Sequence, residues 1–294
     1  MTSVEANGIT IEYESTGEGP PVLFIMGLGA QLVSWPPALR DRIVAAGYRV
    51  ICMDNRDIGL SSEMSGELPT KRQLARSILT RRPGASAYLL SDMANDSAGL
   101  LEALGIERAH VMGVSMGAMI SQALTIEHPD KVASLTSIMS NPGDRRSEGI
   151  SAAMLRFQAR RPAATLENAV DLAVENQLRI GGPHASEADM RTLVTASVAR
   201  SFRPEGVARQ TAAVMASPNR TEGLRSVTVP TLIIHGLLDE LVKPSGGIAT
   251  AKAVPNSRLL MFADMAHDLP ASRTDEIADA MLDNFDRADA LVDA

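Results

Sequence analysis

The sequence is poor in aromatic side chains and almost free of cysteine. Only 3% of its 294 residues are Phe, Tyr or Trp, and 15 methionines supply flexible apolar side chains in their place. The single cysteine, Cys52, excludes a disulfide within the chain, and its place in the apolar run 48–53 predicts that it is buried and inert. No run of about 18 apolar residues occurs, so no membrane-spanning segment is expected.

Basic residues are fewer than acidic residues. The chain has 28 Lys and Arg residues against 35 Asp and Glu residues, which gives a net charge of −7. This balance argues against nucleic acid as a partner, because nucleic-acid-binding proteins usually carry a basic face. Residues 1–8 have neither the basic start nor the apolar core of a secretory signal. We therefore expect a cytoplasmic protein, with no preference between monomer and oligomer.

Apolar runs that alternate with helical patterns predict an α/β core. Strands are predicted at 9–14, 21–26, 49–53, 109–114, 132–139, 231–235 and 258–262. Helices are predicted at 36–46, 92–104, 116–127, 246–253 and 274–289. Ser91 is the expected N-cap of the second of these helices. Because buried strands alternate with helices, the sheet should be mostly parallel and covered on both faces.

The alternation stops between residues 141 and 227. Only helices are predicted there, at 149–160, 165–179, 186–201 and 205–216, separated by proline and glycine. We therefore divide the chain into an α/β core, formed by 1–140 and 228–294, and an all-helical insertion, formed by 141–227. An insertion that follows a strand end should roof a pocket. The basic segment 71–82 is interpreted as a solvated helical face, with a lid as the alternative.

The motif Gly113-Val114-Ser115-Met116-Gly117 lies between a predicted strand and a predicted helix. Strand, sharp turn and helix are the setting of a G-x-S-x-G nucleophile elbow. A serine at the tip of so tight a turn has strained backbone geometry, and the two glycines remove side chains that would collide with the neighbouring segments. Ser115 is therefore the candidate nucleophile. The alternative is a glycine-rich turn with an inert serine.

A serine nucleophile needs a base to accept its proton and an acid to orient that base. Of the five histidines, His267 follows the last strand, and loops after parallel strands share the carboxyl edge of the sheet. His184, in the helical insertion, is the second candidate. Asp239 also follows a strand and is the candidate acid, with Glu240 as the neighbour that could replace it.

A tetrahedral intermediate needs backbone N–H groups that bind its negatively charged oxygen. The N–H of Met116, directly after the serine, is one candidate. The loop after strand 21–26 should supply the other, since glycines at 27 and 29 allow close approach of the backbone. We expect the N–H of Leu28 to act there, with that of Gly29 as the alternative.

Five segments in this order resemble the α/β-hydrolase superfamily and, more narrowly, bacterial carboxylesterases of the aclacinomycin methylesterase type. The segments are 26–29, 54–62, 110–117, 236–239 and 267–270. The resemblance implies an α/β-hydrolase fold, in which helices flank a mostly parallel central sheet and an all-helical cap is inserted. It also implies a catalytic triad of Ser115, Asp239 and His267, and an oxyanion hole formed by the N–H groups of Leu28 and Met116.

These observations favour a serine carboxylic ester hydrolase that forms an acyl-serine intermediate on a small or medium-sized apolar ester. Two alternatives remain: a cofactor-free perhydrolase of the haloperoxidase type, and a ligand-binding protein with slow turnover. No cofactor and no metal are expected, and the predicted partners are a small-molecule ester and water. The candidate substrate-binding residues are Gly27, Gly29, Leu155, Phe157 and Phe202.

Overall fold

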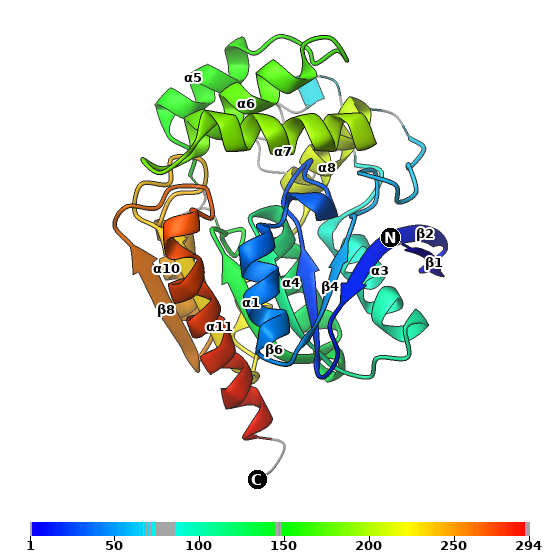
Figure 1. The fold of residues 1–294 in the computed structure, drawn as a ribbon, viewed down its shortest axis with the longest axis vertical. Helices are drawn as coiled ribbons and strands as arrows, with labels where there is room; N and C mark the ends of the chain where they lie inside the picture. Colours follow the sequence, from blue (N-terminus) through cyan, green and yellow to red (C-terminus); the bar gives the residue numbers. More distant parts are fainter. Residues whose placement is uncertain are drawn as a thin grey trace.

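A single eight-stranded sheet forms the centre of the computed structural model, which describes residues 2–66, 68, 70, 72–73, 86–144, 147 and 149–291 (Figure 1). The strands are β1 (Thr2–Ala6), β2 (Ile9–Thr16), β3 (Pro21–Ile25), β4 (Arg49–Met53), β5 (Ala109–Val114), β6 (Val132–Ile138), β7 (Thr231–Gly236) and β8 (Ser257–Phe262). Their order is β1-β2-β4-β3-β5-β6-β7-β8. Only the pairs β1–β2 and β2–β4 are antiparallel, so the mostly parallel sheet predicted from the sequence is confirmed.

Helices cover both faces of the sheet. One face carries α1 (Pro37–Ala45) and α11 (Thr274–Asp289), and the other carries α3 (Leu90–Ala103), α4 (Met116–Glu127) and α10 (Ser245–Ala253). Short 3-10 helices are η1 (Leu32–Ser34), η2 (Pro129–Lys131) and η3 (Ala271–Arg273). Side chains alternate between the two apolar cores along each strand: Leu23 and Ile25 enter one core, and Val22 and Phe24 enter the other.

Between β6 and β7 all secondary structure of the described residues is helical. The helices are α5 (Ala152–Arg160), α6 (Ala169–Ile180), α7 (Glu187–Arg200), α8 (Pro204–Ala216) and the short α9 (Thr221–Leu224). Helices α5 to α8 lie together beyond the carboxyl ends of the parallel strands, at the top of Figure 1. We call these four helices the helical layer. Its division from the core at residues 141 and 227 stays a prediction.

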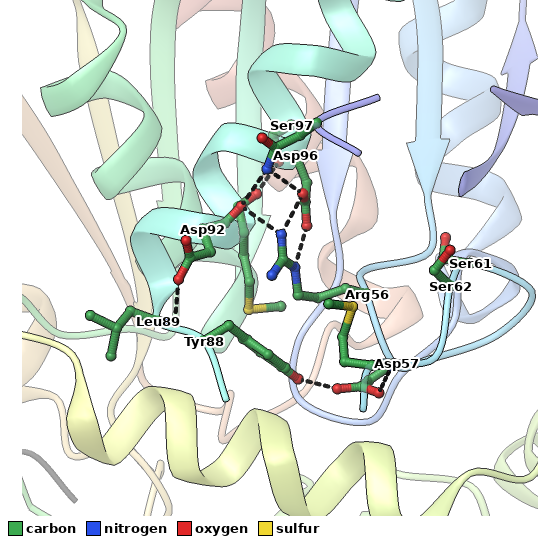
Figure 2. A network of polar contacts seen from close by, with 12 residues as sticks. Arg56, Asp57, Ser61, Ser62, Tyr88, Leu89, Asp92, Asp96 and Ser97 are labelled. Carbon is green, nitrogen blue, oxygen red and sulfur yellow. Dashed lines mark hydrogen bonds and ion pairs between the residues drawn. The ribbon is translucent and has the colours of Figure 1, made fainter. Parts of the chain in front are cut away.

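Two details differ from the sequence prediction, and a third prediction falls mostly on residues that the structure does not describe. β1 was not predicted, because among its residues only Ala6 is buried and no apolar pattern marks it. α3 begins at Leu90, so Ser91 lies inside the first turn, and the Asp92 carboxylate caps the helix by accepting a hydrogen bond from the Leu89 N–H at 2.7 Å (Figure 2). Apart from 72–73, the basic segment 71–82 lies outside the described residues.

A buried polar network fixes the loop that follows β4 (Figure 2). Both carboxylate oxygens of Asp96 in α3 accept hydrogen bonds from the Arg56 guanidinium at 2.6 Å, and both side chains are buried. The same guanidinium lies 5.0 Å from the ring centre of Tyr88. The Tyr88 hydroxyl donates to Asp57 at 2.6 Å. Charged groups are stable at such a buried position only when they are paired in this way.

The same loop is ion-paired to the helical layer. Asp54 is fully buried, and its carboxylate lies 2.6 Å from the Arg200 guanidinium at the end of α7. Asp57 is equally buried and lies 2.8 Å from the Arg209 guanidinium of α8. A buried charge that loses its partner is strongly destabilising, so these two ion pairs hold α7 and α8 in place over the sheet.

The contact between Arg209 and Asp57 is therefore expected to contribute strongly to stability. Arg209→Met leaves the Asp57 carboxylate buried without its cation, and the free energy of unfolding should fall by about 3 kcal/mol or more. Arg225→Met is the matched control, because Arg225 pairs with Glu222 at an exposed site and should cost less than about 1 kcal/mol. Urea denaturation followed by circular dichroism measures both. Equal losses in the two variants would contradict the expectation.

Candidate active site

Ser115 lies at the sharp turn between β5 and α4. Its backbone has φ 56° and ψ −119°, a conformation that is strained for any residue with a side chain. A Cβ atom on Gly113 would lie 2.3 Å from the backbone of Gly117, and a Cβ atom on Gly117 would lie 2.0 Å from the Ile25 carbonyl oxygen. Both positions therefore require glycine, as expected for a nucleophile elbow.

The loops after β7 and β8 bring Asp239 and His267 to this turn. His267 Nε2 lies 2.9 Å from Ser115 Oγ, and His267 Nδ1 lies 2.7 Å from Asp239 Oδ2. The Asp239 and His267 residues are 3% and 9% exposed, so water barely competes for these contacts. The structure thus unites the three predicted residues in one hydrogen-bonded chain, although Ser115 and His267 are 152 positions apart in the sequence.

The Asp239 carboxylate is surrounded by hydrogen-bond donors. Its Oδ1 accepts from the N–H groups of Leu241 at 2.9 Å and Val242 at 2.8 Å. His235 Nε2, which donates to the Val242 carbonyl at 2.8 Å, also lies 3.4 Å from Oδ2. Burial raises the pKa of this carboxyl, but the charge of His267 and the hydrogen bonds from His235, His267 and Val242 outweigh burial and lower the pKa to about 2. A carboxylate that stays ionised can hold the His267 proton on Nδ1 and leave Nε2 free for the serine hydroxyl.

The alternative base and acid lie in other contacts. His184 Nε2 lies 3.1 Å from Asp264, at an exposed site. The Glu240 carboxylate accepts a hydrogen bond from Arg179 of α6 at 2.5 Å. Among the described residues, neither His184 nor Glu240 is hydrogen-bonded to the side chains of Ser115, His267 or Asp239. The geometry therefore favours His267 as the base and Asp239 as the acid.

Two further groups that could react are buried and uncharged. Burial lowers the pKa of His110 to about 4, and His110 lies at the start of β5, away from Ser115. Burial raises the pKa of the Cys52 thiol to about 12, so a thiolate does not form. In the part of the chain that the structure describes, no three His, Cys, Asp or Glu side chains cluster as metal ligands. No helix there combines the length and apolar character that crossing a membrane requires.

The turn after β3 runs directly against the serine. A Cβ atom on Gly27 would lie 3.3 Å from the Ser115 Cβ. Within the described residues, no acceptor takes the N–H of Leu28 or that of Met116, whereas the Gly29 N–H donates to Gln210 Oε1 at 2.9 Å. The N–H of Gly29, the alternative donor, is therefore already occupied. The two N–H groups that the sequence predicts for the oxyanion are free.

The helical layer also binds the loops that carry the acid and the base. The His267 N–H donates to the Ile180 carbonyl at the end of α6, at 3.0 Å. The Ser151 N–H, before α5, donates to the Glu240 carbonyl at 2.8 Å. The loops after β3, β7 and β8 therefore each have at least one hydrogen bond to the helical insertion.

A cavity of about 410 Å³ lies beside the acid and base loops. It is lined by Arg179, Ile180, Gly181, Gly182, Pro183, Leu238, Glu240 and Ala266. Leu155, Phe157 and Phe202 are not part of this lining. Leu155 is half exposed, and the Phe157 ring lies 5.8 Å from the Arg161 guanidinium. Their contact with substrate stays a prediction.

The chain resembles known proteins over most of its length. A family model described as alpha/beta hydrolase fold matches residues 20–272. The chain is 30% identical to the putative non-heme bromoperoxidase BpoC of Mycobacterium tuberculosis, over 94% of this chain and 98% of that protein. It is 26% identical to rhodomycin D methylesterase DnrP of Streptomyces peucetius, over 93% and 94% of the two chains. A malate-bound thermophilic esterase from Thermogutta terrifontis has a similar solved structure, with a TM-score of 0.72, 23% identity and coverage of 98% and 99%.

The lowered pKa of Asp239 predicts a loss of stability in acid. Its pKa is about 2 in the folded protein and about 3.9 in an unfolded chain, so the ionised carboxylate stabilises the fold above about pH 4 and this contribution disappears as the pH falls to about 2. Over that window the wild type should lose about 2 kcal/mol of unfolding free energy that Asp239→Asn does not lose.

Urea denaturation between pH 2 and pH 5 tests this expectation. Asp171→Asn is the control, because it removes a carboxylate that is 74% exposed and should keep the pH dependence of the wild type. If Asp239→Asn lost stability in acid as steeply as the wild type, the carboxylate would not be held ionised by the contacts described.

Proposed function

The chain belongs to the α/β-hydrolase family, and on that premise we propose that it is a serine carboxylic ester hydrolase acting on small or medium-sized apolar esters. The observation that carries the proposal is the hydrogen-bonded chain from Ser115 through His267 to Asp239. The protein is also 26% identical, over nearly its whole length, to a protein named a methylesterase, and this similarity supports ester chemistry.

In the proposed first step, Ser115 Oγ attacks the ester carbonyl carbon and His267 Nε2 accepts the hydroxyl proton. The carbonyl oxygen becomes an oxyanion, which the N–H groups of Leu28 and Met116 bind. Such donors are each worth on the order of 10²–10³ in kcat. The intermediate collapses, His267 donates its proton to the leaving alcohol, and the acyl group remains on the serine.

In the second step, water attacks the acyl-serine while His267 accepts its proton. The acid product leaves and the serine recovers its hydrogen. Asp239 holds the histidine tautomer through Nδ1 and stabilises the imidazolium that forms in each step. The helical layer would act as the cap over the acyl pocket, and Leu155, Phe157 and Phe202 would line that pocket. Gly27 and Gly29 would leave room for the substrate to approach the backbone of the turn after β3.

A second candidate is peroxide-dependent turnover at the same serine. It is favoured by the 30% identity to the putative non-heme bromoperoxidase BpoC. In this reaction hydrogen peroxide replaces water as the nucleophile, so the acyl-serine yields a peracid and free serine hydroxyl. Peracid release from acetate and hydrogen peroxide by the wild type, and its absence with Ser115→Ala, would favour this candidate over plain hydrolysis.

The primary test is hydrolysis of p-nitrophenyl butyrate by the wild type and by Ser115→Ala, purified side by side. Loss of the nucleophile should lower kcat by on the order of 10⁵–10⁶-fold. Ser121→Ala is the control, because it removes a buried hydroxyl of α4 whose one hydrogen bond among the described residues goes to the Gly117 carbonyl. This variant should retain activity within a few-fold. Full activity of Ser115→Ala would overturn the assignment of the nucleophile.

A further inference from the structure

The backbone turn that carries the Leu28 N–H has little support of its own. The Ala30 N–H donates to the Gly27 carbonyl at 3.2 Å and closes the turn, with Leu28 and Gly29 at its corners. Gly29 has φ 70°, which glycine adopts without strain. Corner peptides of a turn have no partner in a strand or helix, so their orientation depends on groups from outside the turn.

Gln210 of α8 supplies such a group. Its Oε1 accepts the Gly29 N–H at 2.9 Å, and its Nε2 donates to the Arg56 carbonyl at 2.9 Å. The orientation of the amide is unambiguous, because one partner is a donor and the other is an acceptor. The side chain is fully buried, so water cannot replace either bond. One side chain thus links the turn after β3 to the loop after β4.

The helix that carries Gln210 is itself held tightly. A Cβ atom on Gly206 would lie 2.1 Å from the Asp57 carbonyl oxygen, so α8 contacts that loop backbone to backbone. Arg209 is ion-paired with Asp57 at 2.8 Å. The side chain of Val207 contacts the turn from the same helix, 3.2 Å from where a Cβ on Gly29 would lie. These contacts leave Gln210 little freedom to follow the turn if the turn moves.

Among the described residues, the other side-chain hydrogen bonds near the turn lie at its two ends. Asn55 Nδ2 donates to the Met26 carbonyl at 2.9 Å, before the turn. Gln31 Nε2 donates to the carbonyl groups of Ser197 and Ser201, after the turn. Among these side-chain hydrogen bonds of the described residues, the one that Gln210 accepts from the Gly29 N–H lies at the corner next to Leu28.

From this arrangement we infer that Gln210 is a positioning residue, which holds the Leu28 N–H in the direction that stabilises the oxyanion. The inference rests on the proposed ester hydrolase function. Its consequence is that a residue of the helical layer completes the catalytic machinery of the core. Without Gln210, the peptide between Leu28 and Gly29 loses its anchor. The adjoining peptide between Gly27 and Leu28, which carries the Leu28 N–H, can then shift with the turn and lose its fixed direction.

The expected kinetic effect falls on kcat, because the oxyanion exists only after the attack by the serine. Gln210→Met has a similar length and makes neither hydrogen bond, and it should lower kcat about 10- to 100-fold with KM changed less than about threefold, since the Leu28 donor is displaced rather than removed. Gln210→Glu keeps an oxygen that accepts from Gly29, and it should hold the turn in place better than Gln210→Met.

Backbone amide exchange of Gly29, measured by NMR, reports the hydrogen bond without any substrate. In Gln210→Met the Gly29 N–H should exchange at least about tenfold faster, and in Gln210→Glu it should stay close to the wild-type rate. Thr211→Val is the matched control: it loses a hydroxyl that bonds to Val207 within the same helix, and it should change neither the exchange rate nor kcat.

Two results would overturn the inference. Unchanged Gly29 exchange in Gln210→Met would show that the side chain does not hold the turn. Faster exchange with kcat unchanged, or with the whole loss in KM, would show that the turn does not act on the oxyanion. Gln210→Asn, one methylene too short to reach both partners, provides the same test if Gln210→Met fails to fold. Absence of Ser115-dependent hydrolysis in the wild type would instead overturn the proposed function, and the Gly29 exchange rate would still decide the role of Gln210 in the turn.

Discussion

Close approach of three backbone segments at Ser115 is the constraint on which the rest of the site depends. The end of β3, the end of β5 and the first turn of α4 meet so tightly that side chains at Gly113 and Gly117 have no room. This crowding forces the positive φ of Ser115 and exposes its hydroxyl at the carboxyl edge of the sheet. It also brings the turn after β3 within contact of the serine, where, in the proposed function, the Leu28 N–H acts together with that of Met116.

Much of this arrangement could be predicted because it follows from short-range rules. Apolar runs alternating with helices identified the parallel sheet, and β5 and α4 have the predicted bounds. Loops after parallel strands share one edge, which is why Ser115, Asp239 and His267 could be selected from the sequence and why the structure unites them. The spacing of Gly113 and Gly117 around Ser115 predicted the sharp turn, because side chains at those two positions would collide with neighbouring backbone.

The contacts that the sequence did not reveal are long-range and polar. Gln210 lies 181 positions from Gly29, and nothing local distinguishes it from a solvated glutamine on a helix. Arg209 reads as an exposed cation until the fold buries it against Asp57. Ser91 followed a common capping preference, but Asp92 caps the helix instead. Such contacts depend on which loops the tertiary fold brings together, and no periodic pattern in the sequence predicts them.

The hydrogen bonds from the helical layer to the loops of the site limit how a substrate can reach Ser115. A rigid hinge that swung α5 to α8 away as one body would break the bonds of His267 to Ile180, of Glu240 to Ser151 and of Gly29 to Gln210 together. It would also expose the unpaired carboxylates of Asp54 and Asp57. Opening the site in this way would dismantle it, so a substrate can reach an intact site only while the layer remains docked.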